Sequence, residues 1–248
     1  MTESLSSRKR LSASQHTIAG TVLTMPVRIR NANQHMAMFS VDADAAQRMI
    51  DYSGLQVCRH LPGRAMVVLI LAHFVDGDLG EYHELSTGVM VNQPGTTVSR
   101  VRALQSVFIH HMLVDQGFTL EAGRTIWGFP KVMADFTIRD GHQFGFDASI
   151  DGQLAVGVEF RPGLPVPSAF TARTQQNPTY SYRDGVLRET IGETSFSGVR
   201  YRLGGARLWL GNHPYARELA SLGLPKRAML SSSVDHAQMS FGDARILN

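Results

Sequence analysis

Cysteine, lysine and long apolar runs are all scarce in this chain of 248 residues. The single cysteine, Cys58, excludes an intrachain disulfide and any cysteine-rich zinc or iron–sulfur site. The longest apolar run, residues 65–72 with an extension towards Phe74, reaches about half of the roughly 20 residues that span a membrane. A basic cluster near the N-terminus has no apolar segment behind it, so we expect no secretory signal, no membrane partner and a cytoplasmic location.

Net charge is also low. The formal net charge is +3, and arginines alternate with acidic residues, as on a solvated surface. There is no basic stripe with interleaved aromatic residues, which argues against a nucleic-acid partner. An apolar content of 43% excludes a disordered chain and is enough for a sizeable core.

Runs of β-branched and aromatic residues predict strands along most of the chain. These runs cover residues 27–30, 35–41, 65–74, 82–91, 107–114, 206–210 and 228–239. Asp42 precedes good helix formers as a candidate N-cap, and residues 213–222 predict a second short helix. We expect residues 1–18 to form a flexible arm and residues 19–248 to form a single domain.

Asp-Gly dipeptides separate several of these runs. Asp140-Gly141, Asp151-Gly152 and Asp184-Gly185 supply the positive φ angles that tight hairpins need. Three such turns favour an antiparallel meander over βαβ units. The sequence therefore predicts an α+β fold that is mainly antiparallel β.

The scarcity of lysine draws attention to one position. Of the 24 lysine and arginine residues, only three are lysines: Lys9, Lys131 and Lys226. A genome-wide bias towards arginine largely explains this low ratio of lysine to arginine. Lys9 lies in the N-terminal arm and Lys226 in a polar connection. Lys131 instead follows Gly128 and Pro130, which predict a strained turn at the entry to a strand.

Lys131 is flanked by Trp127, Phe129, Val132 and Met133. Desolvation by such neighbours favours the neutral amine, which is a nucleophile. The alternative, which composition alone favours, is a lysine whose amine extends past these side chains into water.

Glu84 is a second candidate, because it lies inside a predicted strand on the same face as Tyr82 and Ser86. Its alternative is an outward-facing carboxylate. Arg28 and Arg30 share a strand face and can hold a carboxylate through bidentate hydrogen bonds, although most such arginines only line a surface.

His110 and His111 occupy adjacent strand positions and should face opposite ways, which argues against a shared metal site. The sequence has no metal-ligand spacing, no Ser-His-Asp order and no phosphate-cradling glycine loop. It therefore predicts no metal site.

Together these segments resemble the acetoacetate decarboxylase family. That family has a lysine after a proline in a segment of the type Gly-Arg-Glu-…-Pro-Lys-Lys, matched here by Gly123-Arg124 and Phe129-Pro130-Lys131. The resemblance covers most of the chain from about Pro26 onward, in consistent order, and includes residues 82–84, 207–210 and 231–233.

The resemblance implies a cone-like antiparallel β barrel with a few peripheral helices, homo-oligomeric assembly, a small keto acid as substrate, and no metal or organic cofactor. It gives Lys131 the Schiff-base role, in which the amine condenses with the substrate ketone, and gives Glu84 an orienting role. Acetoacetate decarboxylase is itself a known example of a lysine activated by desolvation or by a neighbouring cation. The predicted substrate-binding residues are Arg30, Arg28, Trp127 and Phe129.

Three positions depart from the family pattern. Val132 replaces a second lysine, Ile70 stands near the place of a second carboxylate, and Ala32 occupies the best-matched position for a substrate-facing arginine, with Arg30 close by. The leading hypothesis is a carbon–carbon lyase that decarboxylates a β-keto acid through an iminium on Lys131. The alternatives are an aldolase or dehydratase that acts on a 2-keto acid through the same iminium, and a non-catalytic protein that binds a hydrophobic ligand.

Overall fold

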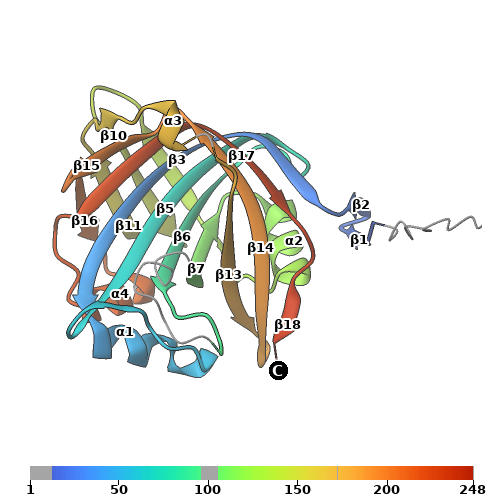
Figure 1. Ribbon diagram of the computed structural model, residues 1–248, viewed down its shortest axis with the longest axis horizontal. Coiled ribbons are helices and arrows are strands. Elements are labelled where there is room, and N and C mark those ends of the chain that lie inside the picture. Colours follow the sequence, from blue (N-terminus) through green and yellow to red (C-terminus); the bar gives the residue numbers. More distant parts are fainter. Residues whose placement is uncertain (1–12, 96–105, 172, 248) are drawn as a thin grey trace, which may run out of the picture.

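The computed structural model describes residues 13–95, 106–171 and 173–247, and its centre is a closed barrel of seven strands (Figure 1). The pairing of β14 with β17 closes the ring, and all neighbours are antiparallel except β7 and β13. The predicted α+β fold, mainly antiparallel and barrel-like, is confirmed. The strands pair in the order β17 (Leu230–Phe241), β3 (Val27–Asp42), β5 (Arg64–Gly77), β6 (Tyr82–Met90), β7 (Val107–Val114), β13 (Gln175–Arg183) and β14 (Val186–Ser197).

A separate four-stranded antiparallel sheet packs against the outside of the barrel. Its order is β16 (Ala206–Leu210), β11 (Gln153–Phe160), β10 (Phe144–Ile150) and β9 (Asp135–Arg139). Phe39, Leu69 and Leu85 of the barrel share one apolar cluster with Phe146 and Val158 of this sheet, and all five are buried. The main core therefore lies between the two sheets.

The strand register defines two faces of the barrel wall. Residues paired across neighbouring strands share a face, so Leu69, Thr87 and His111 lie on the face that meets the second sheet. We call this the outer face, because a closed barrel of this size cannot enclose a second sheet. The inner face carries the alternate residues, among them Ile70 and Ser86.

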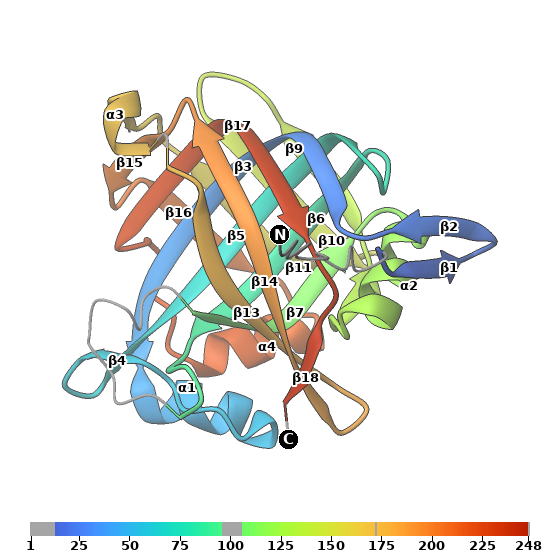
Figure 2. The same cartoon turned by 45° about the vertical axis from the view of Figure 1, so that its right-hand side comes forward.

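Short elements complete the fold. Helices α1 (Ala43–Ile50) and α4 (Pro214–Ser221) lie at one end of the barrel (Figure 1). Helix α2 (Gly117–Ile126) contacts the hairpin of β1 (Gln15–Ile18) and β2 (Thr21–Thr24) (Figure 2). The remaining elements are η1 (Asp51–Ser53), β4 (Arg59–Leu61), β8 (Lys131–Met133), β12 (Leu164–Pro165), α3 (Ser168–Thr171), β15 (Arg200–Leu203) and β18 (Arg245–Leu247). None of the described helices has both the length and the apolar character needed to cross a membrane.

Local sequence signals account for several element boundaries. The Asp42 side chain accepts a hydrogen bond from the Ala45 amide at 2.7 Å and caps α1, as predicted. Asp151-Gly152 and Asp184-Gly185 have positive φ angles at both residues and form the predicted two-residue turns. Asp140-Gly141 instead belongs to a longer loop between β9 and β10.

One expectation for the N-terminal half was wrong, and one helix was not predicted. The predicted flexible arm is contradicted for residues 15–18, which pair with β2 across the Ala19-Gly20 turn and bury Ile18; residues 1–12 lie outside the described residues. Helix α2 was not predicted, because Gly117 and Gly123 weaken the helical pattern of its sequence.

Truncation of a side chain in the core between the sheets should destabilise the protein. Leu69 is 2% exposed, so Leu69→Ala is expected to lower the free energy of unfolding by about 2–5 kcal/mol. Leu203, which is 85% exposed, is the matched control, and Leu203→Ala should change that free energy by less than about 0.5 kcal/mol. Urea denaturation measures both, and equal losses would contradict this location of the core.

Candidate active site around Lys131

Lys131 is the first residue of β8 and is 3% exposed. Strand β8 runs parallel to β7, and Lys131 pairs with Met112, which lies on the inner face. The Lys131 Nζ atom lies 2.8 Å from Glu84 Oε2 and donates a hydrogen bond to Thr119 Oγ1 at 2.8 Å. The predicted burial of this lysine is confirmed, and an amine that extends into water is excluded.

Glu84 meets the lysine from the inner face of β6. It pairs with Ala72 of β5 and Val114 of β7, and its side chain is 13% exposed. The fold thus brings together Lys131 and Glu84, the two residues proposed as catalytic from the sequence. A buried ammonium and carboxylate need further hydrogen bonds to offset their lost hydration, and Thr119 supplies one.

Tyr82 adds a neutral hydroxyl to this group. The Lys131 Nζ atom lies 5.3 Å from the centroid of the Tyr82 ring, within the range of a cation–π contact. Burial, followed by the nearby Glu84 carboxylate, raises the pKa of Tyr82 well above its usual value, while a hydrogen bond with Thr119 acts in the opposite direction. The phenol therefore stays protonated and can donate a hydrogen bond.

Helix α2 holds Thr119 in place beside the lysine. Thr119 is fully buried, and its backbone amide donates to the Gln116 side chain at 2.9 Å. The Gln116 amide nitrogen in turn donates to the carbonyls of Leu79 and Glu81, at 3.0 and 3.2 Å. The N-terminal turn of α2 is thereby fixed to the connection between β5 and β6.

Sequence reasoning missed Thr119 because it missed α2. The signal was present, since Phe118, Ala122 and Ile126 recur at every fourth position, which is a helical spacing.

Gly123 and Arg124, which carry part of the family resemblance, hold Lys131 in two different ways. A Cβ atom on Gly123 would lie 2.5 Å from Lys131 Cε and 2.6 Å from Cδ, so a glycine is needed to leave room for the side chain. Arg124 donates from Nε and Nη2 to the Lys131 carbonyl oxygen, at 2.9 and 2.5 Å. One residue shapes the path of the side chain, and the other fixes the backbone.

Val132 and Met133 do not help to bury Lys131, which corrects the sequence prediction. They are 37% and 45% exposed. Because side chains alternate along a strand, Val132 faces away from the lysine amine. Residues of α2 and of the inner face of β6 bury the lysine side chain instead.

Trp127 and Phe129, predicted to bind substrate, lie in an apolar cluster that includes Tyr82. Trp127 is 3% exposed, and its indole nitrogen donates to the Gly242 carbonyl at 2.8 Å. Phe129 is half-buried and packs near Trp127, with ring centroids 6.2 Å apart. These contacts hold the end of α2 in place, and a substrate-binding role for either residue stays a prediction.

Apolar side chains line the inner face next to Glu84. Ile70 pairs with Met36 on one side and with Ser86 on the other. Ile70, Met36 and Met38 are all partly exposed, although their strands are flanked by neighbours on both sides. This part of the inner face is therefore partly accessible to solvent and mostly apolar.

The structure does not bring Arg28 or Arg30 to the buried lysine. Both alternate with buried Ile29 and so point to the outside of the barrel. The Arg30 guanidinium donates to Asp76 at 2.7 and 2.9 Å and to Asp78 at 2.6 Å, and these carboxylates raise its pKa. The predicted carboxylate clamp beside Lys131 is therefore corrected, because Arg30 is held by surface acids.

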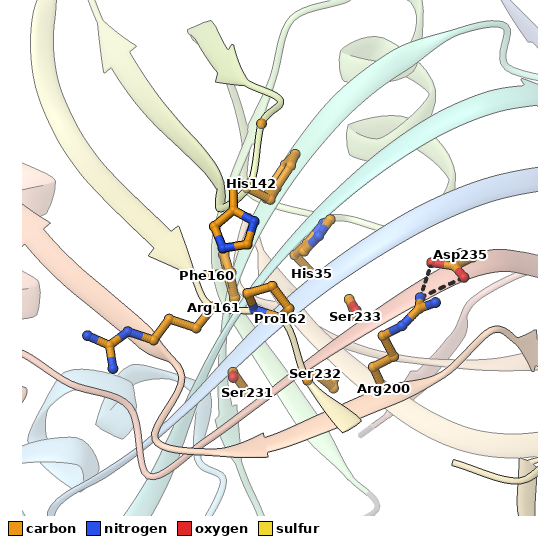
Figure 3. A pocket seen from close by; sticks show the side chains of 13 residues that line it. His35, His142, Phe160, Arg161, Pro162, Arg200, Ser231, Ser232, Ser233 and Asp235 are labelled. Carbon is orange, nitrogen blue, oxygen red and sulfur yellow. Dashed lines mark hydrogen bonds and ion pairs between the residues drawn. The ribbon is translucent and has the colours of Figure 1, made fainter. Parts of the chain in front are cut away.

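A surface pocket of about 260 Å³ lies on the other side of the wall (Figure 3). His35, on the outer face of β3, stacks on Phe144 with ring centroids 3.7 Å apart, and burial lowers the pKa of His35 to about 4. Arg200 and Asp235, which lie together at one side of this pocket, form an ion pair at 2.8 Å. Residues 231–233, which belong to the family resemblance, also line it. This pocket is distinct from the surroundings of Lys131.

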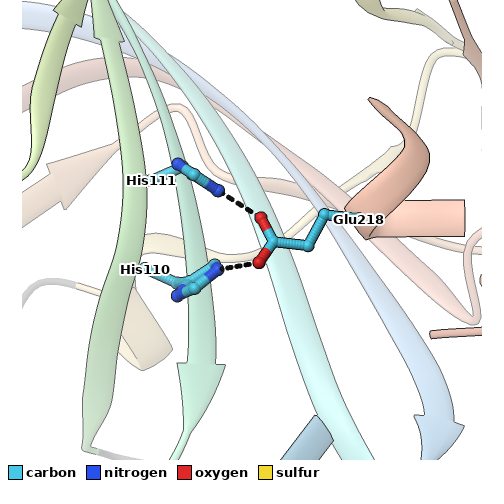
Figure 4. A group of neighbouring side chains, drawn as sticks. All are labelled: His110, His111 and Glu218. Atoms are coloured by element: carbon cyan, nitrogen blue, oxygen red, sulfur yellow. Dashed lines mark hydrogen bonds and ion pairs between the residues drawn. The ribbon is translucent and has the colours of Figure 1, made fainter. Parts of the chain in front are cut away.

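His110 and His111 face the same way, which corrects the expectation from strand alternation. The register of β6 against β7 shifts where Thr87 opposes His111 and the next residue opposes Ile109. This β-bulge leaves His110 as the extra residue. Both imidazoles therefore turn towards the Glu218 carboxylate of α4, on the outer face (Figure 4).

A closed, mainly antiparallel barrel with a lysine amine buried beside a carboxylate defines a protein able to activate an amine nucleophile. The family model for acetoacetate decarboxylase matches residues 15–247, and the chain belongs to the acetoacetate decarboxylase family, whose members are enzymes. No curated protein matches the sequence.

Three solved structures have a similar fold. The enduracididine biosynthesis enzyme MppR, complexed with the condensation product of pyruvate and imidazole 4-carboxaldehyde, is 16% identical, with a TM-score of 0.63 and 90% of each chain covered. Acetoacetate decarboxylase from Legionella pneumophila is also 16% identical, with a TM-score of 0.63 and coverage of 90% of this chain and 87% of that one. An acetoacetate decarboxylase-like enzyme from Sphingomonas wittichii RW1 is 14% identical, with a TM-score of 0.60 and coverage of 95% and 100%.

Gly123→Ala should displace the Lys131 amine. The new methyl group would lie 2.5 Å from Lys131 Cε, and the flexible end of the side chain would move more readily than the helix backbone. We expect the amine to lose its contacts with Glu84 and Thr119, so that less adduct forms on borohydride reduction with a keto acid, while the circular dichroism spectrum is unchanged. Gly117→Ala, in the same helix with open space around the new Cβ, should react like the wild type. Equal adduct formation in the two variants would contradict this role of Gly123.

Proposed function

We propose that this chain is a Schiff-base lyase that decarboxylates a small β-keto acid resembling acetoacetate. The observation that carries the proposal is the 2.8 Å contact between Lys131 Nζ and Glu84 Oε2 at a buried position. Membership of the acetoacetate decarboxylase family supports the reaction class. Homo-oligomeric assembly and a cytoplasmic location rest on the sequence resemblance and composition, and they stay predictions.

Lys131 is the proposed nucleophile and Glu84 the proposed proton carrier. The ammonium must lose a proton before it attacks, and the Glu84 carboxylate is in direct contact with it. Transfer of this proton converts the ion pair into a neutral amine and a neutral carboxylic acid. Burial does not oppose the formation of these two neutral groups. The amine then adds to the ketone carbon, and Glu84 returns the proton to the hydroxyl that leaves as water, so that a protonated imine remains.

The iminium acts as an electron sink for the loss of carbon dioxide. The bond between the α-carbon and the carboxylate breaks, its electron pair moves towards the iminium nitrogen, and an enamine forms. The apolar inner face near Ile70, Met36 and Met38 solvates a substrate carboxylate poorly and neutral carbon dioxide well, which favours this step. Protonation of the enamine carbon and addition of water release the ketone and free Lys131.

A second candidate is an aldolase or dehydratase that uses the same iminium on a 2-keto acid. The likeness to MppR favours it, because that enzyme has been seen complexed with pyruvate and with a pyruvate condensation product. Release of carbon dioxide from the reacting keto acid separates the lyase from this candidate. A non-catalytic protein that binds a hydrophobic ligand is the remaining alternative, and it would neither form an adduct nor release carbon dioxide.

Borohydride reduction in the presence of acetoacetate or pyruvate should leave a stable adduct on Lys131. Reduction converts the imine into a secondary amine, which peptide mass spectrometry locates. Lys131→Arg keeps the positive charge without forming the imine, so both adduct and turnover should vanish. Lys226→Arg changes an exposed lysine and should keep both. Turnover by the Lys131→Arg protein would end the Schiff-base account.

Glu84→Gln should lower turnover by about 100-fold or more, because an amide cannot accept the lysine proton. The substitution keeps the size of the side chain, so the circular dichroism spectrum should match that of the wild type. Glu121→Gln, at an exposed position of α2, is the matched control. Steady-state rates of carbon dioxide release measure the effect, and equal rates for the two variants would return Glu84 to a structural role.

A further inference from the structure

A second cluster of chemically active side chains lies on the outer face of β7. His110 Nε2 is 3.0 Å from Glu218 Oε1, and His111 Nε2 is 2.5 Å from Glu218 Oε2 (Figure 4). One potential ligand atom of each residue lies within 4.8 Å of the other two. Within residues 13–95, 106–171 and 173–247, this is the one group of three His, Cys, Asp or Glu side chains that meets this criterion.

We propose that His110, His111 and Glu218 form a binding site for a divalent transition-metal ion of the zinc type. Two imidazole nitrogens and one carboxylate are a donor set that zinc uses in sites with three protein ligands. Magnesium and calcium prefer oxygen ligands throughout, so the two histidines select against them. Three ligand atoms each about 2.0–2.1 Å from one ion lie roughly 3.3 Å apart in a tetrahedral arrangement, and small side-chain rotations reach that spacing from the observed one.

The supporting contacts hold the three ligands in this arrangement. Tyr52 Oη lies 2.8 Å from His110 Nδ1, so it can accept a hydrogen bond from a protonated Nδ1, which leaves the Nε2 lone pair for the ion. Helix α4 is anchored next to Glu218 by buried Tyr215, whose hydroxyl forms a hydrogen bond with the Thr87 side chain. The ligands are therefore supplied by a bulged strand and a packed helix, not by mobile loops.

The cluster is also open on one side. The His111 and Glu218 side chains are 28% and 38% exposed, whereas that of His110 is 6% exposed. An ion can enter from the side on which the His111 and Glu218 side chains are exposed, and water can complete the coordination of the ion. The site lies on the outer face and Lys131 on the inner face, so the two can be tested independently.

Cobalt(II) titration of the full chain, prepared without a polyhistidine tag and stripped with a chelator, tests the proposal. We expect visible absorption bands that saturate at one Co²⁺ per chain and disappear when Zn²⁺ is added. His111→Ala and Glu218→Gln should abolish these bands, and Tyr52→Phe should weaken Zn²⁺ binding by about 10- to 100-fold. Lys131→Arg should bind Co²⁺ like the wild type.

A matched control comes from a second pair of histidines. His73 and His83 stack with ring centroids 4.3 Å apart. His73 contacts Glu81, and His83 contacts Asp115. The possible ligand atoms of these four residues do not converge on one point. The double variant His73→Gln/His83→Gln should keep the cobalt bands. Thermal unfolding without metal checks that His111→Ala and Glu218→Gln are folded. Absence of saturable binding in the wild type, or equal binding in the folded variants, would overturn the proposal and leave a hydrogen-bonded contact between β7 and α4.

Discussion

The buried contact between Lys131 and Glu84 is the constraint on which the rest of the site depends. Either group alone is costly to remove from water, and a buried pair persists only where further hydrogen bonds complete it. Strand β6 supplies the carboxylate, β8 supplies the amine, and α2 supplies the Thr119 hydroxyl, so three elements must meet at one point. Proton transfer within the pair leaves the net charge unchanged. The same contact is therefore compatible with a stable barrel and with a reactive amine.

The parallel pairing of β8 with β7 explains why a helix stands beside the lysine. Two parallel neighbours need a crossover connection, because the chain must return to the end at which the first strand began. Residues 115–130 make this return, and α2 forms most of it. The helix passes so close to the lysine that position 123 has no room for a Cβ atom, and Arg124 holds the Lys131 carbonyl. The Gly-Arg pair in the sequence thus reflects the packing of Lys131.

The central pair and six strands, β3, β5, β6, β7, β16 and β17, could be predicted from the sequence, because their signals are local. Apolar runs and alternation depend only on neighbours along the chain, and the apolar flanks of Lys131 drew attention to a rare residue. The predictions failed where distant partners decide the outcome. Arg30 is held by Asp76, far away in the chain, and the direction of His110 depends on the register of β7 against β6. Thr119 is found only once the helix around it is known, and two glycines conceal that helix.

Two of the three departures from the family pattern, at Val132 and Ile70, lie on different faces of the barrel wall. Val132 is next to Lys131 in the chain, yet its side chain faces the other way, so a cation at that position would influence the amine only across the backbone. Ile70 lies on the inner face, diagonally across from Glu84, and places apolar surface there. Among the described residues, Glu84 is then the one carboxylate in contact with the Lys131 amine. The Lys131 amine is therefore held by one carboxylate and by the Thr119 hydroxyl, and the apolar side chain of Ile70 lies diagonally across from that carboxylate.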